Sequence, residues 1–300
     1  MTYHQPRRTA VFLIVAMGAI CGCDSGKTYA PSANLERVKD IRAAFKTVSS
    51  DTQQAAVVVA NPTGFATLRG VFRVDGDVPA AELLVVNKDV EVCAPGGRSI
   101  VSEEVTVSDS GELANVLIYA TNVRDEWAHE AARPGNTEPV SFDQKECRFL
   151  TRVTAIQATQ PLQIFNSDSV GHNTKLAPRA NTPFDQTVPA GSQPLTYQAS
   201  AEEREPFTVV CAIHPWMKAW LITRKNSYFA VTAADGSFEI PNLPAGVELE
   251  FRAWQERVKF LQNVTVNENS EKWKKGKFTH TLENDEVREL TVVVAASELK

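Results

Sequence analysis

The stretch VVCAIHPWMK, residues 209–218, holds the most distinctive combination of side chains in this chain. Residues 207–210 alternate in the manner of a β-strand, so Cys211 is expected at the end of that strand. His214 and Met217 follow on the same short loop, which can fold back over the strand end. A thiolate, an imidazole and a thioether placed so close together are ligand types for a soft metal ion. The stretch therefore predicts a strand that ends in a metal-binding loop.

A second histidine lies upstream in NSDSVGHN, residues 166–173, where an expected strand ends in a polar turn. Two imidazoles, a thiolate and a weak axial thioether suit both Cu(I) and Cu(II), and they form the ligand set of a mononuclear blue-copper site. Zinc is the main competitor, but it gains little from a thioether, so Met217 favours copper. A degenerate site remains an alternative. The sequence thus predicts one type 1 copper site with the ligands His172, Cys211, His214 and Met217.

These two motifs resemble those of the cupredoxins, the family of blue-copper proteins. The resemblance is greatest to the amicyanins, which have an upstream His-Asn pair and a Cys-x-x-His-x-x-Met loop with proline after the histidine. Plastocyanins share the pair but place methionine further away. The resemblance implies a Greek-key β-sandwich or barrel, three equatorial ligands with Met217 as the axial one, and a role for Asn173 in tying the ligand loops together. Ala212 departs from the family, which often has a hydroxyl or amide side chain after the cysteine.

The same resemblance suggests where electrons would leave the site. The edge of His214 is expected at one end of the barrel, and Pro215 and Trp216 would form an apolar docking surface around it. Packing in the core or at the rim is the alternative role for Trp216 and for Trp220.

Residues 1–23 have the pattern of an export signal, in which two arginines precede an apolar run, 11–20, that is too short to span a bilayer. The segment ICGC, residues 20–23, resembles a bacterial lipobox and implies lipidation of Cys23, although Cys21 replaces the usual small residue. We therefore expect an exported protein of the cell envelope or periplasm, held to the membrane by a lipid anchor. A secreted protein without an anchor is the alternative.

Three cysteines lie beyond this leader, namely Cys93, Cys147 and Cys211. An oxidising compartment permits one disulfide among them and leaves one thiol over. Because Cys211 has metal-ligand neighbours, the hypothesis pairs Cys93 with Cys147. The alternatives are that all three are reduced, or that Cys211 is itself paired.

The rest of the chain predicts an all-β protein. Residues 24–62 are interpreted as a spacer that contains an amphipathic helix at 34–48. Short alternating runs separated by turn residues then predict antiparallel strands, with a copper domain at 63–224 and a smaller β-sandwich at 225–300. In the latter, DGSF (235–238) and LPAG (243–246) resemble phrases of the carboxypeptidase regulatory-like, transthyretin-like fold, a spacer or interaction module without catalysis.

The net charge argues against a nucleic-acid-binding protein, and the positions of the other histidines argue against a multicopper enzyme. A formal net charge of −5 without a basic stripe excludes a nucleic-acid partner. His4, His129 and His280 are isolated, so a second copper centre of the kind that oxidases and nitrite reductases use has no ligands. The sequence thus predicts a carrier rather than an enzyme, with a redox protein partner such as a dehydrogenase or cytochrome. The alternative is a non-redox copper-binding or cell-envelope interaction protein with a degenerate or storage-type site.

Overall fold

The computed structural model describes residues 34–48, 60–135 and 137–300. The chain divides into two units, residues 1–58 and 59–300. The predicted leader with Cys23 lies outside the described residues, and so does part of the predicted spacer. Within the described ranges, no helix is both long and apolar enough to cross a membrane.

The described part of the first unit is helix α1 (Leu35–Val48), so the helix predicted from the spacing is confirmed. Asn34 caps the helix, because its Oδ1 accepts the backbone N–H of Arg37 at 3.2 Å. The apolar side chains of Leu35 and Ile41 are exposed.

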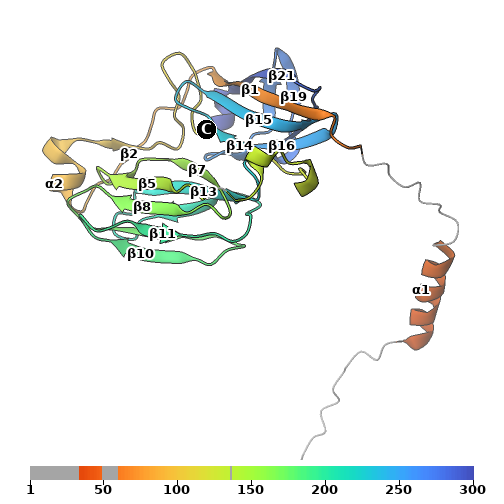
Figure 1. The fold of residues 1–300 in the computed structure, drawn as a ribbon. Coiled ribbons are helices and arrows are strands. Elements are labelled where there is room, and N and C mark those ends of the chain that lie inside the picture. Colours follow the sequence, from red (N-terminus) through yellow and green to blue (C-terminus); the bar gives the residue numbers. More distant parts are fainter. Residues whose placement is uncertain (1–33, 49–59, 136) are drawn as a thin grey trace, which may run out of the picture. The chain divides into compact units, whose positions relative to one another are not determined.

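The second unit consists mainly of β-strands, as the sequence predicts (Figure 1). Two sheets in it share one core and form what we call the site sandwich. Buried side chains from both sheets meet in this core, among them Ile164 from one sheet and Leu221 from the other. One sheet has the order β10 (Phe184–Val188), β9 (His172–Leu176), β12 (Phe207–Val210), β13 (Lys218–Arg224) and β7 (Val153–Gln157), and the other has the order β11 (Leu195–Tyr197), β8 (Leu162–Asn166), β5 (Val140–Lys145) and β6 (Arg148–Phe149).

The strands of this sandwich follow the period-2 pattern that predicts them. In β8, Leu162, Ile164 and Asn166 are buried while the residues between them are partly exposed. In β12, Phe207 and Val209 are buried in the same way. Alternate side chains of a strand point to opposite faces, so each strand presents one apolar face to the shared core.

The other two large sheets form a second sandwich, which we call the companion sandwich. They share a core that includes Phe72, Phe251 and Val292. One sheet has the order β15 (Ser237–Ala245), β1 (Gly64–Asp75), β21 (Val287–Ala295), β18 (Asn263–Val266) and β19 (Asn269–Lys272), and the other has β14 (Phe229–Val231), β4 (Leu117–Ala120), β16 (Glu248–Gln255) and β17 (Lys259–Phe260), with β20 (Lys277–Thr281) also paired to β16. Short 3-10 helices lie at Asp125–Trp127, Glu130–Ala132, Lys274–Gly276 and Ala296–Leu299.

The sheets do not follow the predicted boundary between residues 224 and 225. Strand β1 pairs antiparallel with β15 and parallel with β21, so it belongs to the companion sandwich. Strand β4 pairs with β14 and β16 in the same sandwich. Local periodicity predicts that a segment is a strand, but the choice of partner depends on buried faces far away in the sequence. The assignment of 63–224 to a single copper domain is therefore corrected for these two strands.

A small excursion between β1 and β4 completes the fold around the site. Strands β2 (Leu83–Leu84) and β3 (Ile100–Val101) pair with each other, and helix α2 (Val90–Cys93) and a 3-10 turn (Pro95–Gly97) lie between them. We call residues 83–101 the cap. It is joined to the site sandwich by the Cys93–Cys147 disulfide.

Candidate metal centre

Strand pairing brings the two ligand motifs together. Strand β12 runs antiparallel to β9, with Val210 opposite Lys175. Cys211 follows β12 directly, and His172 is the first residue of β9, so the end of one strand lies beside the start of the other. The loop after Cys211 then turns back, because Met217 N–H donates to the His214 carbonyl at 2.9 Å.

Three of the four predicted ligands converge with their donor atoms. The Nδ1 atoms of His172 and His214 are 3.0 Å apart, and Cys211 Sγ lies 3.8 Å from His214 Nδ1. All three side chains are buried, and their ligand atoms lie within 4.8 Å of one another. Met217 is buried in the same core, and its carbonyl accepts the N–H of Cys211 at 3.3 Å. Its role as the axial ligand stays a prediction.

The spacing of these atoms fits one metal ion. Bonds of about 2.0–2.1 Å to nitrogen and about 2.3 Å to sulfur, at angles of about 90–120°, separate the donors by about 2.9–3.8 Å. The observed 3.0 Å and 3.8 Å agree with that range. The donor set, two imidazoles and a thiol with a methionine nearby, is suited to copper.

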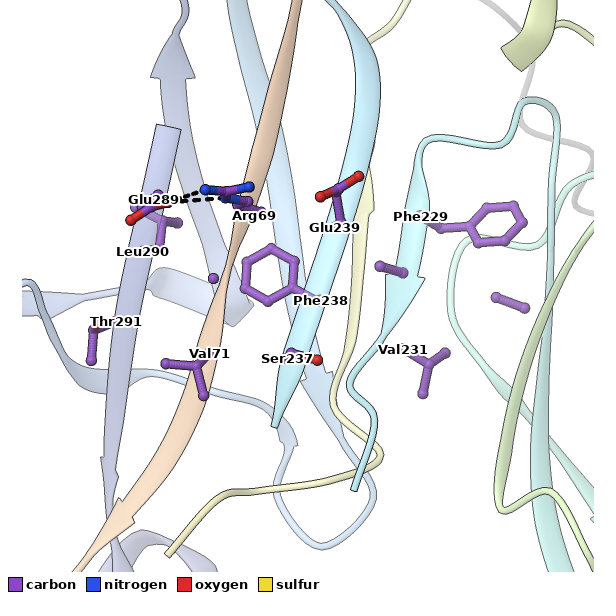
Figure 2. Close-up of a pocket in the computed structure, with 13 residues that line it drawn as sticks. Arg69, Val71, Phe229, Val231, Ser237, Phe238, Glu239, Glu289, Leu290 and Thr291 are labelled. Atoms are coloured by element: carbon purple, nitrogen blue, oxygen red, sulfur yellow. Dashed lines mark hydrogen bonds and ion pairs between the residues drawn. The ribbon is translucent and has the colours of Figure 1, made fainter. Parts of the chain in front are cut away.

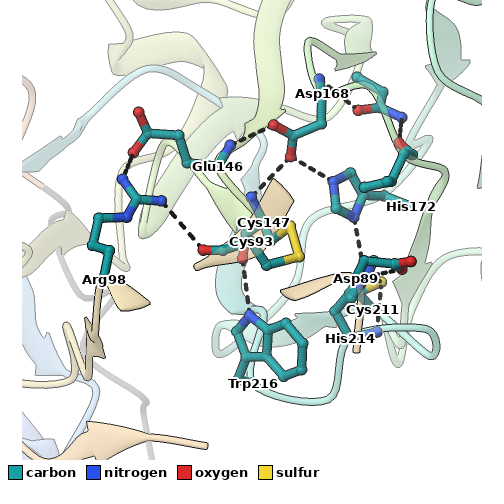
Figure 3. The surroundings of a disulfide bond; sticks show 12 residues. Asp89, Cys93, Arg98, Glu146, Cys147, Asp168, His172, Cys211, His214 and Trp216 are labelled. Atoms are coloured by element: carbon teal, nitrogen blue, oxygen red, sulfur yellow. Dashed lines mark hydrogen bonds and ion pairs between the residues drawn. A yellow bond between two sulfur atoms is a disulfide. The ribbon is translucent and has the colours of Figure 1, made fainter. Parts of the chain in front are cut away.

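Hydrogen bonds on the far side of each ring strengthen this conclusion. Asp168 Oδ2 lies 2.7 Å from His172 Nε2, and Asp89 Oδ2 lies 2.8 Å from His214 Nε2 (Figure 3). A carboxylate only accepts, so each Nε2 carries the proton. Two neutral rings would then face each other with their Nδ1 lone pairs, the nitrogen atoms being 3.0 Å apart, and this contact is favourable only with a shared proton or a metal ion between them. The site is therefore built to hold a positive charge.

Two backbone N–H groups fix the position of the sulfur. Cys211 Sγ accepts the backbone N–H groups of Asn173 and His214, each at 3.3 Å. Asn173 also accepts the N–H of Ala212 through its Oδ1 at 3.1 Å, and its Nδ2 donates to Asp185 at 2.9 Å. Asn173 thus connects the two ligand loops in the way that the resemblance implies.

Burial governs the protonation of His172. Removal from water lowers the pKa of this imidazole below its usual value, although the hydrogen bond that His172 donates to Asp168 and the negative charge of Asp168 act in the opposite direction. The neutral ring that results is the form that binds metal ions.

The expected electron exit differs from what the structure shows. His214 has no exposed surface, because Asp89 of the cap lies against its Nε2. Pro215 is exposed, whereas Trp216 is half-buried and donates its Nε1–H to the Cys147 carbonyl at 3.1 Å. Trp220 is buried and packs against Trp254 with ring centroids 5.0 Å apart. The cap, which lies far from the ligand loops in the sequence, is the reason for the difference.

The cysteines are arranged as the hypothesis from their number suggested. Cys93 and Cys147 form a disulfide, and Cys211 is a free, buried thiol. The disulfide is close to the centre, because its two sulfur atoms and a ring nitrogen of His214 lie within 4.8 Å of one another.

Two carboxylates of the site were not predicted from the sequence. Asp168 lies four positions before His172 in the predicted turn, so its proximity could have indicated the contact. Asp89 is 125 positions from His214, and no local pattern connects them.

A groove in the companion sandwich is separate from this centre. It is lined by residues of β1, β14, β15 and β21, with Ala155 of β7, and none of them is a histidine or cysteine (Figure 2). Arg69 Nε donates to Glu289 Oε1 at 3.0 Å across this surface.

Comparison with known proteins gives weak structural likenesses. A Cu-containing nitrite reductase from Thermus scotoductus SA-01 has 16% identity and a TM-score of 0.27, over 34% of this chain and 27% of that one. Amicyanin from Paracoccus versutus has 16% identity and a TM-score of 0.25, over 36% of this chain and 97% of that one. A reduced amicyanin variant has 11% identity and a TM-score of 0.25, over 36% and 98%. This chain thus spans only about a quarter of the nitrite reductase.

No family model matches the chain. No curated protein matches it either.

Proposed function

We propose that this protein binds one copper ion at a type 1 site and acts as an electron carrier of the cell envelope. The observation that carries the proposal is that the Nδ1 atoms of His172 and His214 lie 3.0 Å apart beside the buried Cys211 thiol. His172, Cys211 and His214 would hold the ion, with Met217 as the weak axial ligand. Bound copper supplies a one-electron couple between Cu(II) and Cu(I).

The surrounding residues support a carrier because they fix the donors in place. Each imidazole is oriented by a carboxylate, and the sulfur by two N–H groups. Asn173 links the two loops that carry these donors. A site that holds its ligands in this way cannot rearrange much between two oxidation states, which favours fast electron exchange.

Location and partner belong to the same proposal. The Cys93–Cys147 disulfide supports export, because disulfides persist in oxidising compartments. The lipid anchor at Cys23 would keep the protein at the membrane, and a dehydrogenase or a cytochrome would be its redox partner. The exposed Pro215 beside the site would belong to the surface that meets this partner.

The visible spectrum of the copper-loaded protein tests the proposal. Addition of Cu(II) should produce an intense blue thiolate-to-copper band at a ratio of one copper per chain. Cys211→Ser should abolish the band, whereas His280→Gln, a matched loss of a histidine in the companion sandwich, should leave it unchanged. A protein that takes up no copper, or one that binds Zn(II) in preference to copper, would refute the copper site.

Copper storage without electron transfer is a second candidate, and one observation favours it. His214 has no exposed surface, so the usual ligand edge for electron exchange lies beneath the cap. Reversible voltammetry separates the two functions. A carrier gives a reversible one-electron wave at moderate scan rates, whereas a storage protein binds Cu(I) tightly and gives none.

A further inference from the structure

The cap places one carboxylate directly on a predicted metal ligand. Asp89 Oδ2 lies 2.8 Å from His214 Nε2, and the Asp89 side chain keeps 35% of its surface exposed while His214 has none. Asp89 has left-handed backbone angles, with φ 47° and ψ 40°, a conformation that glycine adopts freely and that asparagine and aspartate adopt more readily than most other residues. Its carbonyl accepts the N–H groups of Val92 and Cys93, so the same residue begins helix α2.

We propose that Asp89 is a positioning residue that holds His214 in the ligating tautomer, lowers the copper reduction potential and, with the cap, covers the electron exit. The proposal rests on the copper function proposed above. It adds a determinant of the potential that lies outside both ligand motifs.

The effect on the potential follows from the hydrogen bond. A proton shared between Nε2 and a carboxylate leaves more electron density on Nδ1, which makes Nδ1 a stronger ligand. The stronger ligand and the negative charge of Asp89 both stabilise Cu(II) more than Cu(I), because Cu(II) carries the larger charge. Asp89 should therefore lower the potential.

The two carboxylates of the site are held in different ways. Asp168 is almost fully buried and accepts the N–H groups of Glu146 at 2.7 Å and Cys147 at 2.8 Å, so the site sandwich itself fixes it. Asp89 is on the cap and is partly exposed. Of the two carboxylates, Asp89 is accordingly the one that solvent reaches and that depends on the cap for its position.

The disulfide links the segment that contains Asp89 to the segment that holds Asp168 in place. Cys93 lies four positions after Asp89, and its partner Cys147 supplies one of the N–H groups that hold Asp168 (Figure 3). Arg98 adds a second link, because it pairs with Glu146 and donates to the Cys93 carbonyl at 3.3 Å. The cap is thus anchored beside His214 at several points.

A metal-free measurement tests the positioning role independently of copper. In the full chain labelled with ¹⁵N histidine, the Nε2 proton of His214 should give a resolved, downfield, slowly exchanging NMR signal. Asp89→Gly should remove that signal, because glycine accepts the left-handed backbone but has no carboxylate. Glu91→Gln, which removes an equal charge from an exposed position of the same cap, should keep it. A wild-type protein whose His214 carries no Nε2 proton overturns the inference.

The reduction potential tests the electronic role. Asp89→Asn keeps the shape, the tolerated backbone and an acceptor oxygen, but it removes the charge. If Cu(II) affinity falls about tenfold while Cu(I) affinity is unchanged, the potential rises by about 59 mV. Glu91→Gln should leave it unchanged. Equal losses of Cu(I) and Cu(II) affinity in Asp89→Asn would show a purely structural contact and would overturn this part of the proposal.

Failure of copper binding and failure of this inference are distinguishable. A wild-type protein that shows the Nε2 proton signal but takes up no copper refutes the copper function and retains the positioning of His214. A blue protein whose potential and His214 signal do not respond to Asp89→Asn and Asp89→Gly retains the copper function and refutes the role of Asp89.

Discussion

Asn173 uses different atoms to contact the two ligand loops. Its backbone N–H donates to Cys211 Sγ, and its Oδ1 accepts the N–H of Ala212. Its Nδ2 donates to Asp185 and, at 3.2 Å, to the Gln186 carbonyl. Removal of the side chain breaks only the hydrogen bonds made by Oδ1 and Nδ2, and the burial of Asn173 limits how far water can replace them.

We expect Asn173→Ala to lower the free energy of unfolding by about 1–3 kcal/mol, through the partners left unsatisfied. Copper affinity should fall about 10- to 100-fold, because the ligand loops lose their connection. The matched control is Asn181→Ala, beyond the other end of β9, which also loses amide hydrogen bonds to two backbone N–H groups. The control should lose stability but keep its copper affinity, and equal affinities in both variants would contradict the prediction.

Met217 can be tested with little disturbance of the core. It is buried, and leucine has a similar volume, so Met217→Leu should cost less than about 1.5 kcal/mol of stability. An axial thioether donates weakly to Cu(II), and its loss should raise the reduction potential while the blue band remains. Voltammetry and EPR of the copper-loaded variant measure this. If the reduction potential and the EPR parameters are unchanged, Met217 is a core residue and not a copper ligand.

At this scale, short motifs decide what the sequence can predict. The histidines, the cysteine and the methionine lie in two motifs of eight to ten residues, and ligand chemistry makes those motifs recognisable. Asp89 has no such motif, because it reaches His214 across 125 positions through the placement of the cap. The contact of Asp89 with His214 depends on the tertiary structure, and no local sequence motif predicts it.

Among the elements, the cap is the one whose position depends most on a covalent bond. It contains a two-stranded ladder, helix α2 and a short 3-10 turn, which together offer few backbone hydrogen bonds to the rest of the molecule. The disulfide joins it to Cys147 between β5 and β6. Short elements of this kind are marginal without such a tether.

We expect Cys93→Ala with Cys147→Ala to lower the free energy of unfolding by about 2–4 kcal/mol. The bond closes a loop with a sequence separation of 54 residues, for which chain entropy alone gives about 4 kcal/mol. Alanine is chosen rather than serine, because a serine at either buried position would place an unpaired hydroxyl in the core. Denaturant titration measures the stability, and amide exchange at Val92 reports the cap. Unchanged protection at Val92 would show that the cap holds its place without the disulfide.

For the whole molecule, the two sandwiches share a small core of their own. Its buried members come from both sandwiches, namely Leu117, Tyr119, Val153, Trp220, Ile222 and Trp254. A charged pair lies at the same junction. Arg152 Nε and Nη2 donate to Glu256 at 2.6 Å and 2.8 Å, and its Nη1 donates to the Lys218 carbonyl at 2.7 Å.

The sequence predicts the strands of this molecule, but it does not predict which strands share a sheet. The sequence predicts an all-β chain and two β regions because alternation is a local signal. It does not predict that β1 and β4 cross to the companion sandwich, since β1 and its neighbour β21 are separated by more than two hundred positions, as in the pairing of Gly70 with Leu290. The predicted division at residues 224 and 225 is therefore wrong for β1 and β4, which precede it in the sequence but pair with strands that follow it.

The ion pair between Arg152 and Glu256 should make the protein more stable at neutral pH than in acid. Burial raises the pKa of Glu256, but the hydrogen bond and charge of Arg152 outweigh it, so the folded pKa is below the usual value. A carboxylate with a depressed pKa contributes stability above its unfolded pKa of about 4.3, and that contribution is lost as the pH falls through the lower, folded value. The pair should thus stabilise the junction at neutral pH and fail in acid.

Arg152→Met should therefore destabilise the protein by up to about 3–5 kcal/mol at pH 7, because it removes the main partner of the Glu256 carboxylate, which is 2% exposed, and leaves only Lys218 at 3.2 Å to offset its charge. Glu256 can protonate in acid, so the loss should shrink below about pH 4. Arg152→Met with Glu256→Gln should recover part of the stability at pH 7. Denaturant titrations across this pH range measure all three proteins, and a loss that stays constant with pH would mean that packing rather than charge holds the junction.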